Sequence, residues 1–171
     1  MRKFLLAITA VAALAVPAAA SARPPAASPS IVETAVAVNS SGAYAGAFDT
    51  LICLVANNPA VLATLTEKGQ YTVFAPTDDA FARLGIDSSN CATAAATPGV
   101  TDVLLYHVAK GRRDAADVTT TSQIRMLNGQ FTQISTNSTA YFVNNAQIIA
   151  TDIFASNGVI HAIDNVLLPS E

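Results

Sequence analysis

The sequence has no tryptophan, only two histidines and only two cysteines among its 171 residues. A zinc site that used His107 and His161 would need carboxylates as well, all within about 2 Å of one metal, and the sequence shows no such cluster. It also has no G-x-S-x-G elbow and no phosphate-binding glycine loop. These absences argue against an enzyme, so we expect no catalytic residue, no metal and no cofactor.

Positive charge is scarce as well. The chain has 9 Lys and Arg against 12 Asp and Glu, and loss of Arg2 and Lys3 with a cleaved leader would lower its formal charge from −3 to −5. A chain of this charge is poorly suited to phosphate backbones and to anionic bilayers. We therefore expect no nucleic-acid partner.

The one long apolar run lies at the N-terminus. Arg2 and Lys3 precede an apolar stretch at 4–16, which is shorter than the roughly 20 residues of a membrane span, and a small-residue cleavage site follows at 20–22. We predict a signal peptide at 1–22, cut after Ala22, and a flexible Pro/Ala/Ser linker at 23–30. The mature chain is then a secreted or periplasmic monomer without membrane insertion.

The two cysteines, Cys53 and Cys91, are an even number in an exported chain. Oxidising compartments favour disulfides, so we predict that they are bonded rather than free thiols. No CxxC pattern supports a metal or redox site. A disulfide that closes a loop of this length would stabilise the fold by about 4 kcal/mol in the chain-entropy model.

The first half of the remaining chain is predicted to be helical. Apolar residues recur at helical spacing in 31–38 and 48–56, and Asn58-Pro59 opens a third helix as cap and first residue, ending near Gly69. A helical piece is also expected at 115–118.

A short apolar strand at 72–75 then meets a proline and turns into a helix that Gly85 ends. Thr77 or Asp78 is placed to cap that helix, and Asp79 lies favourably for its dipole. We expect 87–99 to be a loop that holds Cys91.

The second half is predicted to consist of strands and tight turns. Asn-Gly or Asn-Asn pairs at 128–129, 144–145 and 157–158 separate apolar segments, which is typical of successive hairpins. Because helices come first and hairpins follow, without βαβ alternation, we predict an α+β fold with mostly antiparallel strands.

The last segment, 157–169, opens on Asn157-Gly158 and is apolar on both alternating faces until Pro169. It predicts a strand buried on both sides, with Val159, Ile163 and Leu167 facing one way and Ile160, Ala162, Val166 and Leu168 facing the other. His161 falls within this strand, so we expect a core histidine with a hydrogen-bond partner.

Three stretches, 72–81, 104–108 and 157–169, resemble the signature blocks of the fasciclin-like domain, and 31–35 and 48–51 resemble its start. The resemblance covers 31–169 as one domain. It implies a wedge of two β-sheets with the N-terminal helices packed on it, and an extracellular adhesion module. It also brings His107 close to Asp78 and Asp79, so we expect a hydrogen bond between His107 and one of these aspartates.

In animal members of that family, an Asp-Ile pair and a Tyr-His block are associated with integrin-dependent adhesion. Asp152-Ile153 and Tyr106-His107 match those positions and are candidate binding residues. We expect Asp152 and Ile153 to be partly exposed in a surface loop; the alternative is that Ile153 and Phe154 belong to the core. The bacterial-looking leader does not favour integrin itself.

The sequence is compatible with two functions. One is adhesion to a matrix or cell-surface protein or polysaccharide, for which the lack of tryptophan leaves only a thin sugar-stacking surface. The other is a carrier of a small apolar ligand between sheet and helices. A carrier needs an apolar cavity, whereas an adhesion module needs none.

Overall fold

The computed structural model describes residues 28–137 and 139–170. The predicted signal peptide, its cut after Ala22 and the linker up to residue 27 lie outside the described residues. The helices of the described part are α1 (Ile31–Ser40), α2 (Asp49–Ala56), α3 (Pro59–Thr66), α4 (Asp78–Ala82), α5 (Cys91–Ala95), α6 (Val100–Leu105) and α7 (Ala115–Thr120). The strands are β1 (Tyr71–Pro76), β2 (Val108–Lys110), β3 (Gln123–Arg125), β4 (Phe131–Thr136), β5 (Tyr141–Val143), β6 (Ala146–Ala155) and β7 (Gly158–Ile163).

The first three helices lie where the apolar spacing predicts them, and their caps explain where they begin. Ser30 and Glu33 form a capping box at the start of α1, and Asn58 accepts a hydrogen bond from the Val61 N–H at the start of α3, where Pro59 is the first helical residue. Pro29, which we placed in the linker, accepts hydrogen bonds from the Thr34 hydroxyl and the Ser156 N–H. The ordered domain therefore begins before Ile31.

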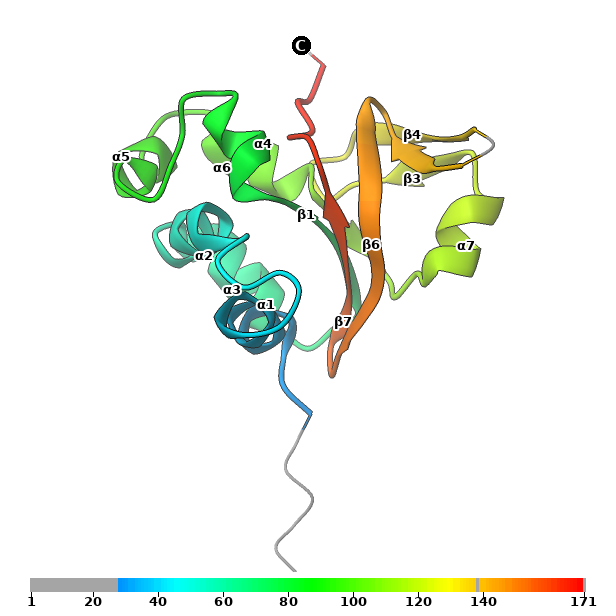
Figure 1. Cartoon of the computed structure of the whole chain (residues 1–171), viewed down its shortest axis with the longest axis horizontal. Coiled ribbons are helices and arrows are strands. Elements are labelled where there is room, and N and C mark those ends of the chain that lie inside the picture. The colour runs from blue at the N-terminus through cyan, green and yellow to red at the C-terminus, as the bar shows by residue number, and fades with distance from the viewer. Residues whose placement is uncertain (1–27, 138, 171) are drawn as a thin grey trace, which may run out of the picture.

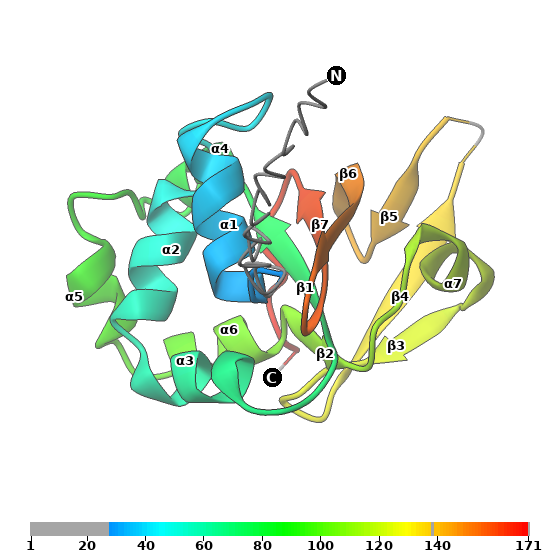
Figure 2. The same cartoon turned by 90° about the horizontal axis from the view of Figure 1, so that it is seen from below.

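The strands form one hydrogen-bonded series in the order β2-β1-β7-β6-β5-β4-β3. Every neighbouring pair is antiparallel except β1 and β7, so the predicted hairpins are confirmed and the fold is α+β. The series curls until its two ends meet at a bridge between Ala109 and Met126. Figures 1 and 2 show the resulting wedge, with helices α1 to α6 on one side and β3 to β5 on the other.

The wedge encloses two apolar clusters, one on each side of the central strands. The helix-side core lies between the helices and β1 and β7, and includes Ile160, Ala162 and Val166; the strand-side core lies within the curl of the strands, and includes Ile163 and Leu167. The two faces predicted for the last segment therefore point into different cores. This is why β7 is buried along its whole length.

Two boundaries differ from the prediction. Strand β7 ends at Ile163 rather than running to Pro169, and Leu168 is 58% exposed instead of buried, because the chain leaves the sheet after the turn at Asp164 and Asn165. The stretch 87–99, predicted as loop, contains the short helix α5, whose Cys91 is buried against α2.

The predicted disulfide between Cys53 and Cys91 is confirmed, with their Cα atoms 6.0 Å apart. It joins α2 to α5 and so holds the segment between α4 and α6 against the helix layer. Within the described residues no single helix is long and apolar enough to cross a membrane; α2 and α3 reach that length and composition only together, with a bend of 96° between them.

Candidate functional site

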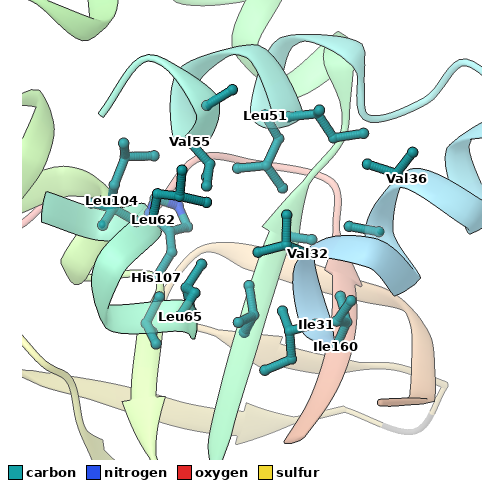
Figure 3. A pocket seen from close by; sticks show the side chains of 17 residues that line it. Ile31, Val32, Val36, Leu51, Val55, Leu62, Leu65, Leu104, His107 and Ile160 are labelled. Atoms are coloured by element: carbon teal, nitrogen blue, oxygen red, sulfur yellow. The ribbon is translucent and has the colours of Figure 1, made fainter. Parts of the chain in front are cut away.

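An apolar cavity of about 320 Å³ lies within the helix-side core. Helices α1, α2 and α3 form one wall, and Val73, Ala75 and Ile160 of β1 and β7 form the opposite wall (Figure 3). Protein interiors have few voids larger than a water molecule, so a space of this size is not ordinary packing. It falls at the lower end of the range of small-molecule pockets, about 300–1,000 Å³.

Small side chains help to leave the space open. Ala35 of α1 and Ala75 of β1 both line the cavity, in positions where a larger apolar residue would extend into it. Most of the wall is formed by buried or half-buried side chains, and Ile31, Val61 and Leu104 are among the buried ones. Val36 of α1, in contrast, is 44% exposed. Val36 and the exposed Ala56 of α2 therefore mark the mouth.

His107 is the one lining residue with a polar side chain, and both of its ring nitrogens are already engaged. The Leu167 N–H donates to Nε2 over 2.9 Å, so Nδ1 carries the proton and donates to the Val103 carbonyl over 2.7 Å. Burial lowers the pKa of His107 from 6.5 to about 4, against the smaller opposing effect of the Val103 hydrogen bond. The imidazole is thus neutral at pH 7 and offers a ligand no free hydrogen-bonding atom.

The predicted hydrogen bond between His107 and Asp78 or Asp79 is wrong. His107 instead joins Val103 of α6 to the segment after β7, so it connects the second and third signature blocks. Asp78 faces another helix: its carboxylate accepts the N–H groups of Asp49, over 3.2 Å, and Thr50, over 2.8 Å, at the start of α2. Asp78 therefore caps α2 from outside that helix.

Thr77 and Asp79, the neighbours of Asp78, make no such link to another helix. Thr77 occupies the N-cap position of α4 but makes no capping bond with its side chain. Asp79 lies exposed in the first turn of α4, where a negative charge suits the helix dipole.

Tyr106 is only 4% exposed and belongs to the strand-side core. Its hydroxyl donates to the Phe131 carbonyl over 3.1 Å and accepts from the Asn144 side chain over 3.0 Å. Buried in this way, Tyr106 presents no side-chain surface to a partner outside the fold. His107 is equally buried, but it borders the cavity.

Asn157 and Gly158 anchor the helix layer to the sheet. The Asn157 side chain accepts the Ile31 N–H and donates to the Leu65 carbonyl, each over 2.7 Å, so it ties the start of α1 to the end of α3. A Cβ at residue 158 would collide with the Tyr71 carbonyl, which explains the glycine.

His161 is a fully buried core histidine, as predicted, between Arg113 and Asp152. Its Nε2 donates to the Arg113 carbonyl over 2.9 Å, and its Nδ1 accepts from the Asp152 N–H over 3.3 Å. Burial lowers its pKa, while the Arg113 hydrogen bond and the nearby Asp152 and Asp114 charges act in the opposite sense.

Asp152 and Ile153 lie within β6 rather than in a loop after it. Asp152 has φ of 60° at an irregularity in the β6–β7 register, and its carboxylate accepts the Ala115 N–H at the start of α7. Ile153 is half-buried against the helix-side core, whereas Phe154 is 52% exposed beneath the Arg112 guanidinium. Asp152 and Ile153 are thus partly exposed, as expected, but in a strand and not in a loop, and Phe154 does not belong to the core.

The cavity was not found by sequence reasoning, although the carrier hypothesis required one. Its only sequence signal is the pair of alanines on facing elements, and the sequence does not show which positions face each other. Among the residues that the structure describes, no group of three or more His, Cys, Asp or Glu side chains is placed to hold a metal ion.

Comparison with known proteins gives a consistent family. Residues 46–169 match the family model of the Fasciclin domain. The chain is 38% identical to protein sll1735 of Synechocystis over 82% of this chain and 98% of that one, and 33% identical to the immunogenic protein MPB70 of Mycobacterium bovis over 66% and 57%. It is 36% identical to the rabbit transforming growth factor-beta-induced protein ig-h3 over 62% of this chain and 15% of that one.

A solved structure of a FAS1 domain pair from the insect cell adhesion molecule Fasciclin I superimposes with a TM-score of 0.65. The two share 14% sequence identity over 82% of this chain and 51% of that one, so the likeness concerns the fold.

Proposed function

The chain belongs to the fasciclin-domain family, and from that premise we propose that it is an exported, non-enzymatic binding module that carries a small apolar ligand in the cavity between its helices and its sheet. The observation that carries the proposal is the chemistry of the lining: sixteen of its seventeen residues are nonpolar, and the remaining one, His107, has its ring nitrogens engaged within the fold. The disulfide is in keeping with export to an oxidising compartment.

An apolar space of this kind favours hydrocarbon over water. A water molecule needs two to four polar partners, and apolar cavities without them stay dry and take up apolar molecules. Each methylene group moved from water into such a site contributes about 0.8 kcal/mol. This gain works against the entropy cost of association, so longer apolar chains should bind more tightly until the cavity is full.

The proposal is tested by titrating the mature protein with the neutral fluorescent probe N-phenyl-1-naphthylamine. We expect saturable binding by the unaltered domain, and binding at least about tenfold weaker in Ala35→Phe, whose ring would occupy the cavity. Ala37→Phe is the matched control, because Ala37 is exposed on α1 and does not line the cavity. Equal affinity of the two variants, both with native circular dichroism, would exclude the cavity as the binding site.

Adhesion to a matrix or cell-surface protein or polysaccharide is a second candidate. It is supported by exposed apolar side chains on the strands, namely Phe131, Tyr141, Ile149 and Phe154, and by the description of the structural relative as a cell adhesion molecule. Such anchors with polar surroundings are typical of weak protein interfaces.

The adhesion candidate needs a variant that leaves the fold intact. Asp152 and Ile153 are unsuitable, because both make structural contacts. Phe154→Ser, with Leu84→Ser as an exposed apolar control, should reduce attachment of domain-coated beads to the surface of the producing cells. Attachment equal to that of the control would remove the Phe154 surface from consideration.

A further inference from the structure

The helices that form one wall of the cavity carry charge of one sign only. Residues 31–67, which contain α1, α2 and α3, include Glu33, Asp49 and Glu67 and no Lys or Arg. The first basic residue after them is Lys68, beyond the end of α3. All three acidic side chains are exposed.

The interior of the cavity cannot compensate a charged or strongly polar ligand group. His107 has the only polar lining side chain, and it is held by the Val103 carbonyl and the Leu167 N–H. A polar group carried inside would lose its water without gaining a partner, at a cost of several kcal/mol on apolar transfer scales. The polar end of any ligand must therefore remain at the mouth, beside Val36 and Ala56.

A carboxylate held at this mouth finds no cation among the residues that line the cavity, and the charged side chains of α1 and α2, Glu33 and Asp49, are both acidic. Like charges about a Debye length apart, 8–10 Å at physiological salt, still repel each other, and the low-dielectric protein beneath them weakens the screening. An uncharged end group avoids this repulsion. Fatty-acid anions and neutral chains of equal length should thus bind differently, although their apolar parts gain the same burial.

The volume limits the apolar part. About 320 Å³ corresponds to the share of about eleven water molecules in the liquid, taken at ~30 Å³ each. A single hydrocarbon chain of about that many carbon-sized units fills this space, whereas a folded pair of long chains does not fit.

We propose, on the basis of the carrier function above, that the cavity selects single-chain, uncharged apolar molecules, such as long-chain alcohols or hydrocarbons, and discriminates against fatty-acid anions. The acidic charge of the surrounding helices and the sealed His107 carry this selectivity together. The first disfavours an anion at the rim, and the second removes any partner for it inside.

The test uses two probes of equal chain length, decan-1-ol and decanoate, at pH 8 and low ionic strength, each displacing N-phenyl-1-naphthylamine from the mature protein. We expect decan-1-ol to bind about tenfold more tightly, with the ratio shrinking in high salt. Equal affinities would overturn the selectivity and leave the carrier function standing. Failure of both the fluorescent probe and decan-1-ol to bind would overturn the carrier function itself.

A charge placed at the mouth gives an independent check that does not depend on the two head groups being otherwise alike. Val36→Lys adds a cation at the rim and should raise the affinity for decanoate relative to that for decan-1-ol by about threefold or more. Ala37→Lys adds the same charge on a residue of α1 that does not line the cavity. An equal gain in both variants would contradict an effect at the mouth.

Discussion

His107 shows how a single buried imidazole can hold two distant segments together. It is 2% exposed and makes its two hydrogen bonds only as the neutral tautomer, with the proton on Nδ1. Protonation would turn Nε2 into a donor facing the Leu167 N–H donor, with no acceptor for either. The neutral form is therefore part of the folded structure.

This leads to a pH dependence whose sign is fixed. The pKa of His107 is about 4 in the folded protein, against 6.5 for an ordinary histidine, so the unfolded state binds the proton first as pH falls. Its contribution to stability is complete above pH 6.5 and is lost between pH 6.5 and 4, reaching roughly 3 kcal/mol. Burial lowers the pKa of His161 too, so it acts in the same direction.

Urea unfolding at pH 7 and pH 4.5 measures this effect. We expect His107→Gln to be less stable than the unaltered protein at pH 7, by about 1–3 kcal/mol for the weakened hydrogen bonds. It should also lose less stability between the two pH values. A loss as large as in the unaltered protein would show that His107 does not titrate in this window.

Asp78 and Asp79 are neighbours of the same type with different structural parts, which makes them a matched pair. Asp78→Asn should lower the free energy of unfolding by about 1–2 kcal/mol, because the amide keeps only one acceptor oxygen for the N–H groups of Asp49 and Thr50. Asp79→Asn, at an exposed position, should change it by less than about 0.5 kcal/mol. Equal effects in thermal unfolding would contradict the capping assignment.

At the scale of residues, local chemistry could be predicted and distant partners could not. The Asn58 cap and the Pro59 position follow from neighbouring residues, and the cysteine pairing follows from there being only two. The partner of His107 lies 60 residues away, on a segment whose path after β7 depends on the whole sheet. Knowing that two blocks approach each other did not reveal which atoms meet.

At the scale of elements, the helix layer is fixed to the sheet by a few contacts around its edge. Asn157 joins the ends of α1 and α3, Asp78 caps α2, and the disulfide ties α2 to α5. None of these contacts fills the space between the helices and β1. The layer can therefore be held in place while a cavity remains beneath it.

The disulfide should contribute substantially to stability. It closes a separation of 38 residues, so the chain-entropy model gives about 4 kcal/mol for its removal. At this domain size the melting temperature should fall by roughly 8–16 °C in the Cys53→Ser, Cys91→Ser double variant. Two alkylatable thiols in the unreduced native protein, found by mass spectrometry, would contradict the bond.

The elements themselves were predictable to different degrees. Asn-Gly and Asn-Asn turns predicted the hairpins, and apolar spacing predicted the long helices. Helix α5 was not predicted, because its five alanine-rich residues show no helical spacing of apolar and polar side chains. The length of β7 was overestimated because apolar residues continue past Ile163, but there they pack as irregular chain.

At the scale of the whole molecule, the wedge divides its interior into two unequal cores. The strand-side core is packed around Phe74, Tyr106 and Ile163, whereas the helix-side core retains the cavity. Since a void costs stability in proportion to its volume, a domain without a ligand would gain from filling it. The sequence indicated an apolar helix layer on a sheet; whether their faces fit closely depends on how they meet, which no local pattern reports.

The most direct test is a crystal structure of the mature domain soaked with 1-bromodecane, in which the bromine is located by its anomalous signal. We expect a bromodecane molecule between α1, α2, α3 and β1, bordered by Val36 at one end and by Leu104 and His107 at the other (Figure 3). Bromine found only at exposed side chains such as Phe131 or Phe154, with the cavity empty at saturating ligand, would contradict it.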